Sequence, residues 1–226
     1  MTMTGTLVNS SAILVGSLIG LAAGRRIPER LKTIVMQGLG LSVILIGLQM
    51  ALTGKDIILI VGCLLIGGVT GELVNIEKCL ENIGERIKQR FRSDSATFAQ
   101  GFVAASLLYL TGAMMIVGSI QDGTTGDSHI LYIKSLLDGV ASIALASSLG
   151  IGVAFSALSV LVVQGGITLL ASHLLFLKMP AVLEAITATG GVLILAIGLN
   201  LLELKKIRVG NLLPAIFYAI AWTALR

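Results

Sequence analysis

Long apolar runs alternate with short polar segments along the whole chain. The apolar runs lie at about residues 7–24, 33–53, 56–75, 97–120, 130–148, 151–177, 182–204 and 210–225. The hydrocarbon core of a bilayer is about 30 Å thick, and a helix of about 20 apolar residues crosses it. The pattern therefore predicts an all-α, polytopic integral membrane protein with about eight transmembrane helices. The fifth and sixth runs meet at residues 147–150, and if they formed one broken or re-entrant element the number would be seven.

Basic residues between the runs predict which side of the membrane each loop faces. Clusters of Lys and Arg follow the first, third and seventh runs, within residues 25–32, 78–92 and 205–208. Short cytoplasmic loops carry the excess of Lys and Arg in membrane proteins. With eight spans all three clusters fall on one side, whereas with seven the last cluster would fall outside. We therefore predict eight spans, both termini outside and a cytoplasmic face formed by the basic loops.

The segment 76–92 is predicted to form an amphipathic helix. Apolar side chains recur at helical spacing at Ile76, Leu80, Ile83, Ile87 and Phe91, and charged side chains fill the opposite face. Such a helix lies on a membrane surface with its basic residues toward anionic lipid. We expect it on the cytoplasmic surface, connecting the third span to the fourth.

The composition supports a membrane protein and narrows the range of functions. Hydrophobic residues make up 55% of the 226 residues and charged residues only 12%, against about 25% charged residues in soluble domains. The sequence has no GxxxxGK[ST] phosphate-binding motif, no HExxH motif and no cysteine cluster. No nucleophile and base stand at a matching depth in two spans. We therefore expect no enzymatic activity, no cofactor and no metal site, and no nucleic acid among the partners.

Part of the sequence recurs. Pro28, Leu31 and Ile34 match Pro180, Leu183 and Ile186, and after a one-residue slip Gly40, Gly47 and Gln49 match Gly191, Gly198 and Asn200. The first three spans, about 7–75, would then repeat as the last three, about 151–225. The repeats are five crossings apart, an odd number, so they would be inverted about an axis in the membrane plane, as in many secondary transporters. Residues 97–148 would form a central two-helix polar hairpin between them, within a single membrane domain, 1–226.

Several segments resemble a known family. They are GTLVNSSAILVGSLIG at 5–20, LLYLTGAMMIVGSIQDGTTGD at 107–127, KSLLDG at 134–139, ASSLGIGVAFSA at 146–157 and QGGITLLA at 164–171. Together they closely resemble the bacterial membrane family catalogued as domain of unknown function 554, over nearly the whole chain. The resemblance implies a multi-pass protein of the bacterial cytoplasmic (inner) membrane, in a family with no established substrate.

The densest charge near apolar sequence lies in the segment 112–139. This segment holds Asp122, Asp127, His129, Lys134 and Asp138. A charged group near the hydrocarbon core is costly unless it is paired or hydrated. Lys134 and Asp138 are four residues apart on one predicted helix, with Asp138 close to mid-membrane. They form either a fixed ion pair that lets the helix insert, or a site where Asp138 binds a cation or proton and Lys134 is its exchangeable partner.

Three residues are candidates to act with this pair. Gln164 lies about halfway along the sixth run and could face the same depth, although a simple interhelical hydrogen bond is the more common role for one glutamine. Asp122 and Asp127 suit either the binding of a hard cation or a solvated turn.

Polar residues elsewhere are predicted to lie near the ends of spans. Gln49 and Asn200 are equivalent in the repeat and could be paired gate residues on opposite sides of the midplane. We expect Asn9, Glu72 and Glu77, at predicted helix ends, to be solvated.

Glycines spaced four residues apart predict close helix packing, because small residues let two backbones approach. They are Gly16, Gly20 and Gly24 in the first run and Gly67 and Gly71 in the third.

Two classes of function remain. The first is a small secondary transporter or channel-like carrier of an ion or small solute, with its site between the inverted repeats. The second is a structural or assembly protein of the membrane that transports nothing. In either case we expect contact with membrane lipid and a homo-oligomer, a dimer or larger.

Overall fold

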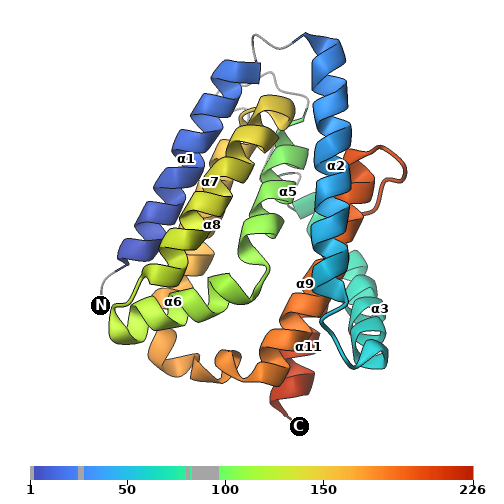
Figure 1. Cartoon of the computed structure of the whole chain (residues 1–226). Coiled ribbons are helices and arrows are strands. Elements are labelled where there is room, and N and C mark those ends of the chain that lie inside the picture. Colours follow the sequence, from blue (N-terminus) through green and yellow to red (C-terminus); the bar gives the residue numbers. More distant parts are fainter. Residues whose placement is uncertain (1–2, 25–27, 80–81, 83–96, 226) are drawn as a thin grey trace. The chain divides into compact units, whose positions relative to one another are not determined.

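The computed structural model describes residues 3–24, 28–79, 82 and 97–225, which form helices and connecting turns with no strand among them (Figure 1). The α-helices are α1 (Thr4–Gly24), α2 (Glu29–Ala51), α3 (Ile57–Val74), α5 (Phe98–Leu110), α6 (Ala113–Thr125), α7 (His129–Leu149), α8 (Gly152–Leu169), α9 (Pro180–Leu201), α10 (Val209–Leu212) and α11 (Pro214–Ala224). The 3₁₀ helices η1 (Ala171–His173) and η2 (Leu175–Lys178) connect α8 to α9. The amphipathic helix predicted at 76–92 lies mostly outside the described residues.

Six of the described helices are long and apolar enough to cross a membrane: α1, α2 from Thr33, α3, α7, α8 and α9. The pair α5 and α6 makes a seventh if it is one span, although the two helices are bent by 64°. The segment Val209–Ala224, which contains α10 and α11, is apolar but shorter. The predicted all-helical chain with several spans is confirmed, and the number eight stays a prediction.

One predicted span is broken. The prediction of a single helix across 97–120 is wrong, because the segment folds as α5 and α6. Gly112 lies between them with φ of 131°, a conformation that glycine tolerates and that interrupts a helix. By contrast, α7 and α8 are two separate helices with Gly150 between them at φ of 79°, so the fifth and sixth runs are not one element.

The helices fall into two compact units, each described by itself. Unit 1 contains α1, α5, α7, α8 and α6 from Met114. Unit 2 contains α2 from Met36, α3, α9, α10 and α11, together with Thr111–Ala113. Unit 1 therefore combines the first helix with helices from the middle of the chain, and unit 2 combines α2 and α3 with helices from its last part.

In unit 1, α1 and α7 lie side by side and run parallel (Figure 1). Gly5 meets Leu131 near the start of both helices, and the contacts continue to their ends. A Cβ atom added to a glycine of α1 would collide with a backbone carbonyl oxygen of α7: Gly16 with Gly139, Gly20 with Ile143 and Gly24 with Ser147. The glycine spacing therefore sets the close approach of these two backbones.

The other helices of unit 1 pack around this pair. α5 runs parallel to α8, with Phe98 against Gly152 at their starts and Ser106 Oγ donating to Ser159 Oγ at 3.0 Å. α6 lies across the first turns of α7 and the end of α8 (Figure 1). Gly118 of α6 packs against Leu131, and Gly123 packs against the carbonyl oxygen of Thr168.

In unit 2, α2 packs against α9 and α3 packs against α10 and α11. The α2–α9 contact is made by glycines: Gly40 and Gly47 on α2, and Gly191 and Gly198 on α9. Gly67 and Gly71 of α3 leave room for Ala215 and for the backbone of Asn211. α9 and α11 each begin with a proline, which is favourable at the first helical position because its missing N–H has no partner there.

Glu72, at the end of α3, and Glu77, which follows it, hold the start of α10. Glu72 is paired with Arg208 and accepts from Asn211 Nδ2 at 2.6 Å. Glu77 accepts from the backbone N–H of Gly210 at 2.5 Å. Glu72 is exposed and Glu77 half-buried, so solvent is only part of their environment.

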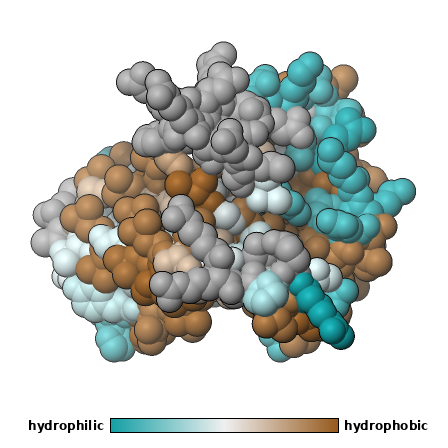
Figure 2. Space-filling view, turned by 90° about the horizontal axis from the view of Figure 1, so that it is seen from above, coloured by the Kyte–Doolittle hydropathy of each residue, from teal (hydrophilic) through white to brown (hydrophobic). Residues whose placement is uncertain are grey.

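Large apolar side chains are exposed on the outer faces of many helices. Ile58 is 86% and Leu73 79% exposed, and apolar residues cover much of the face seen in Figure 2. Apolar area on this scale is what a surface in contact with lipid presents.

Candidate functional site

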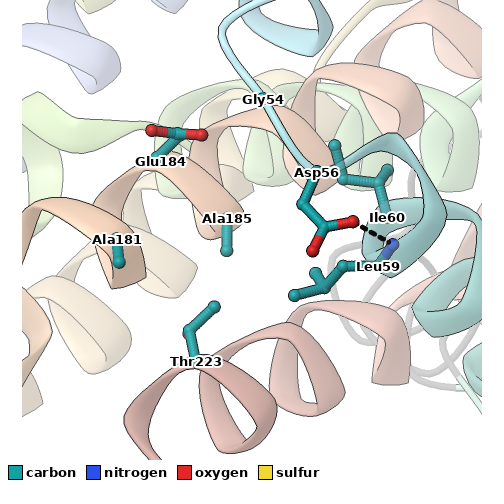
Figure 3. Close-up of a pocket in the computed structure, with 8 residues that line it drawn as sticks. All are labelled: Gly54, Asp56, Leu59, Ile60, Ala181, Glu184, Ala185 and Thr223. Atoms are coloured by element: carbon teal, nitrogen blue, oxygen red, sulfur yellow. Dashed lines mark hydrogen bonds between the residues drawn. The ribbon is translucent and has the colours of Figure 1, made fainter. Parts of the chain in front are cut away.

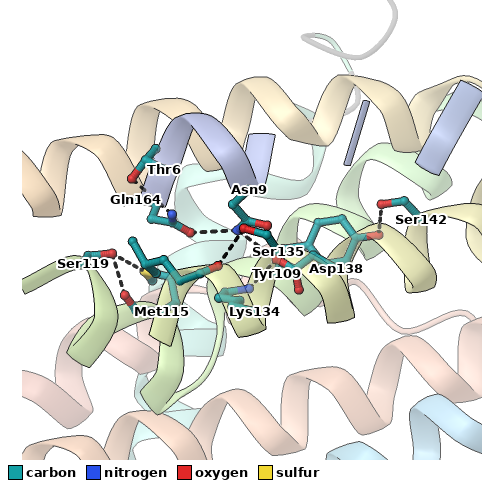
Figure 4. A network of polar contacts seen from close by, with 11 residues as sticks. Thr6, Asn9, Tyr109, Met115, Ser119, Lys134, Ser135, Asp138, Ser142 and Gln164 are labelled. Carbon is teal, nitrogen blue, oxygen red and sulfur yellow. Dashed lines mark hydrogen bonds and ion pairs between the residues drawn. The ribbon is translucent and has the colours of Figure 1, made fainter. Parts of the chain in front are cut away.

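Three helices of unit 1 bring polar side chains together in the interior (Figure 4). Asn9 of α1 donates through Nδ2 to Asp138 Oδ2 on α7 and to Gln164 Oε1 on α8, both at 3.0 Å. Asn9 and Gln164 have no exposed surface, and Asp138 is 7% exposed. One amide therefore links the three helices.

Lys134 and Asp138 form a buried ion pair within α7. Lys134 Nζ donates to Asp138 Oδ2 at 2.5 Å, one helical turn away. The ammonium group also lies 5.9 Å from the centroid of the Tyr109 ring, whose hydroxyl is hydrogen-bonded to Ser142 Oγ at 2.7 Å. Burial of both charges is tolerable because each neutralises the other.

The hydrogen bonds continue to the start of α1. Gln164 Nε2 donates to Thr6 Oγ1 at 3.1 Å, and Thr6 Oγ1 lies 3.3 Å from Thr168 Oγ1. We call Thr6, Asn9, Lys134, Asp138, Gln164 and Thr168 the polar network. It connects α1, α7 and α8, each of which is long and apolar enough to span a membrane.

The burial of Asn9 contradicts the expectation that it is solvated. Although it lies near the start of α1, it is fully buried. The reason is that Asn9 faces α7 and α8, where its amide is hydrogen-bonded to Asp138 and Gln164. Thr6 is fully buried as well, against Gln164 and Thr168 of α8.

Asp122 and Asp127 differ in their environments. Asp122 on α6 is fully buried, accepts from Ser128 Oγ at 2.6 Å through Oδ1, and has no hydrogen-bond partner for Oδ2 within the described part of the chain. Asp127 is exposed and accepts from Gln121 Nε2 at 2.8 Å and from the backbone N–H of His129 at 3.0 Å. Asp127 thus belongs to the turn before α7, whereas Asp122 is an interior carboxyl group.

The two candidate gate residues lie in unit 2. Gln49 is an exposed residue near the end of α2. Asn200 is half-buried, and its amide accepts from the backbone N–H of Ile207 at 2.7 Å and donates to the carbonyl oxygen of Ile207 at 2.8 Å. Asn200 therefore holds the loop that follows α9.

Unit 2 also contains a cavity of about 170 Å³, lined by Gly54, Asp56, Leu59, Ile60, Ala181, Glu184, Ala185 and Thr223 (Figure 3). Its two carboxylates already have partners. Asp56 accepts from the backbone N–H of Leu59 at 3.0 Å, and Glu184 accepts from that of Lys55 at 2.8 Å. We therefore regard the polar network, with its buried charges, as the stronger candidate site.

Comparison with known proteins identifies the family. The model of the protein family of unknown function DUF554 matches residues 4–224. The chain belongs to the DUF554 family. It is 31% identical to the uncharacterized protein YqgA of Escherichia coli (strain K12), over 97% of both chains. It is 33% identical to the uncharacterized membrane protein YdfK of Bacillus subtilis (strain 168), over 95% of this chain and 93% of the relative. No solved structure matches.

Membership of DUF554 confirms the resemblance drawn from the sequence. The match includes every described helix of both units, so the polar network and the glycine contacts all lie within the region that the family model covers. The name of YdfK agrees with a membrane protein. Neither relative has an assigned function, so the function of this DUF554 protein must be argued from its own residues.

Sequence reasoning placed Lys134, Asp138 and Gln164 among the candidates but missed Asn9, Thr6 and Tyr109. One signal was available: Thr6 and Asn9 are three residues apart, and they share a face once the first predicted helix is extended back to Thr6. In membrane proteins, Thr and Asn side chains hydrogen-bond across helices.

Proposed function

We propose that this DUF554 protein is a small secondary transporter or channel-like carrier of an ion or small solute. The observation that carries the proposal is the buried Lys134–Asp138 pair, which Asn9 joins to Gln164. Ionisable residues inside membrane helices are rare, and they commonly mark ion and substrate pathways. The network would be the polar site of the transporter.

The distribution of charge supports a functional difference between the units. The buried charged side chains of the described residues are Asp122, Lys134 and Asp138, and all three belong to unit 1. Unit 2 is held by glycine contacts and by an apolar cluster that includes Cys63 and Ala215. We therefore assign the binding step to unit 1.

The glycine contacts in unit 2 support the proposed inverted repeat. In the repeat, Gly40 corresponds to Gly191 and Gly47 to Gly198. A Cβ atom on Gly47 would lie 2.8 Å from the carbonyl oxygen of Gly191, and one on Gly198 would lie 3.0 Å from that of Gly40. Gly47 thus contacts the equivalent of Gly40, and Gly40 contacts the equivalent of Gly47. A two-fold axis requires such a reciprocal pair of contacts. Inverted repeats are common in secondary transporters.

Flux through proteoliposomes tests the proposal. The purified chain would be reconstituted with an entrapped pH-sensitive dye and exposed to Na⁺, K⁺ or Cl⁻ gradients, and separately to labelled amino acids, sugars and organic acids. We expect protein-dependent flux that Asp138→Asn abolishes. Asp127→Asn, at an exposed carboxylate, is the matched control and should retain it. Absence of protein-dependent movement of every probe would refute transport.

A structural or assembly function is the second candidate, and the hydrogen bonds of the polar network are the observation that favours it. Asp138 accepts from both Lys134 and Asn9, as a fixed link between α1 and α7 would require. In that case, replacing both charged residues by apolar ones should leave function intact.

In either case we propose a homo-oligomer, a dimer or larger, because a chain of 226 residues has few helices with which to hold a transporting unit in place.

A further inference from the structure

The amide orientation of Asn9 leaves one buried oxygen without a partner. Its Nδ2 donates to two acceptors, Asp138 Oδ2 and Gln164 Oε1. Turning the amide over would place an oxygen against both acceptors, so the observed orientation is the favourable one. Asn9 Oδ1 is then a fully buried acceptor with no hydrogen-bond partner among the described residues. Leaving such an acceptor unmatched costs free energy, and a bound cation would recover it.

The groups around Asn9 are oxygen ligands. The carboxylate of Asp138, the amides of Asn9 and Gln164, and the hydroxyl of Thr6 are joined in one series of hydrogen bonds, in which Asn9 takes part through Nδ2. Asn9 Oδ1 lies beside this series as an unpaired oxygen. Carboxylate, amide and hydroxyl oxygens are the ligands of hard cations such as the alkali and alkaline-earth ions.

The charge of the network favours a monovalent ion. Asp138 is its only carboxylate, and within the described residues no three His, Cys, Asp or Glu side chains form a metal-binding group. The buried Asp122 is bonded to Ser128, which precedes Asp138 by ten residues, about 15 Å along a helix at 1.5 Å per residue. With the Lys134 ammonium group also in the interior, a monovalent ion adds one buried positive charge and a divalent ion would add two, so the monovalent ion is the less costly.

In the structure Lys134 supplies the positive charge at Asp138. Its ammonium group also has a second favourable position nearby. Its ammonium group faces the ring of Tyr109 at 5.9 Å, and the face of an aromatic ring attracts cations. The Tyr109 hydroxyl is fixed by Ser142. The flexible lysine stem can therefore exchange the ammonium group between the carboxylate and the ring.

We propose that Asp138 and Asn9 form a binding site for an alkali metal cation, and that the ammonium group of Lys134 pairs with Asp138 when the cation is absent. The inference rests on the proposed transport function and names the class of ion that unit 1 would bind. Cation binding and lysine pairing are then mutually exclusive at one carboxylate.

Cation-dependent stability of the full chain tests the site. Tm would be measured in detergent while NaCl or KCl replaces choline chloride at constant ionic strength. We expect a saturable rise for the wild type. In Lys134→Met the competing ammonium is gone. If it pairs with Asp138 in at least about 90% of molecules, the apparent affinity should rise at least about tenfold. Lys55→Met removes a lysine that is 89% exposed in unit 2 and should leave the affinity unchanged.

A change of ion selectivity gives a second test. Asn9→Asp adds a carboxylate to the same position, so Ca²⁺ should stabilise this variant saturably and should not stabilise the wild type. If the Tm of the wild type shows no saturable response to Na⁺ or K⁺, the site is overturned. It is also overturned if Lys55→Met gains as much affinity as Lys134→Met. The wild-type titration remains decisive if Lys134→Met fails to fold.

Flux separates this inference from the proposed function. Saturable alkali-cation binding without any flux in proteoliposomes would keep the site and refute transport. Flux that is the same in Na⁺, K⁺ and choline would keep transport and overturn the cation site.

Discussion

Removing only one member of the Lys134–Asp138 ion pair should lower stability strongly. Both side chains are nearly buried, at 6% and 7% exposure, so a single apolar substitution leaves one charge in the interior without its partner. Replacing both charges by apolar groups removes the desolvation penalty together with the attraction, and such replacements are often neutral or stabilising. The single and double substitutions therefore have very different consequences.

We predict that Lys134→Met lowers the free energy of unfolding by about 3–5 kcal/mol in choline chloride, the usual cost of stranding one buried charge. Lys134→Met combined with Asp138→Leu should regain most of this loss. Unfolding of the purified variants in detergent, followed by helical circular dichroism, measures both effects. Additive losses in the double variant would show that the two residues stabilise the protein independently. Full transport activity in the double variant would refute the role of Asp138 in binding.

Single residues also show what sequence reasoning can reach. The spacing of Lys134 and Asp138 made their pairing visible, because residues four apart meet on one helix whatever the tertiary structure. Asn9 was missed because its burial depends on α7 and α8, which lie more than one hundred residues away in the chain. Asp122 and Asp127 look alike in the sequence, and only the packing of α6 makes one an interior group and the other a surface group.

At the scale of elements, the α1–α7 contact positions the network. Asn9 has a short side chain, and it reaches Asp138 because glycines let the two helices approach closely. A methyl group added at this contact would push the helices apart and lengthen the Asn9–Asp138 hydrogen bond. Packing and binding are therefore coupled in unit 1.

We predict that Gly20→Ala destabilises the protein by about 1–3 kcal/mol, the usual cost of overpacking, because its Cβ atom would collide with the carbonyl oxygen of Ile143. Gly166→Ala is the matched control. This glycine is also inside a helix of unit 1, and nothing lies within 4 Å of a Cβ atom added there. Alanine is the better helix former, so this variant should be as stable as the wild type or up to about 1 kcal/mol more stable. Equal Tm values for the two variants would contradict the packing argument.

Apolar periodicity predicted most elements but not the break between α5 and α6. Run length is a good guide where a helix is continuous, and α1, α3, α7 and α9 lie close to their expected positions. The run at 97–120 has no proline, and its interruption depends on the positive φ of Gly112, which the residue type permits but does not require. The polar residues 121–125 were the remaining sign that α6 need not cross the membrane.

At the scale of the whole molecule, helix directions within each unit agree with alternating crossings. In unit 1, α1 and α7 run parallel and α8 runs opposite to them. In unit 2, α2 runs opposite to α9, and α3 runs opposite to α10 and α11. These directions are the ones that eight alternating spans require if the α5–α6 pair crosses once and the segment Val209–Ala224 crosses as well.

The last segment decides the number of spans. Val209–Ala224 would be about 24 Å long as a continuous helix at 1.5 Å per residue, slightly less than the hydrocarbon core of about 30 Å. It nevertheless packs against α3 from Asn211 beside Gly71 to Ala215 beside Gly67, so it runs back from the end of α3 toward its start. A segment that retraces a spanning helix ends on the side where that helix began. This direction supports the prediction of eight crossings with the C-terminus outside.

Labelling with a membrane-impermeant maleimide on intact cells tests the topology. Single cysteines would be introduced as Asp127→Cys, Arg226→Cys and Arg86→Cys, after replacing the native Cys63 and Cys79. The basic clusters predict that positions 127 and 226 are labelled and that position 86 reacts only after permeabilisation. Label at 127 without label at 226 would mean that Val209–Ala224 does not cross, leaving seven spans. Label at position 86 in intact cells would invert the assignment, because the basic loops would then lie outside.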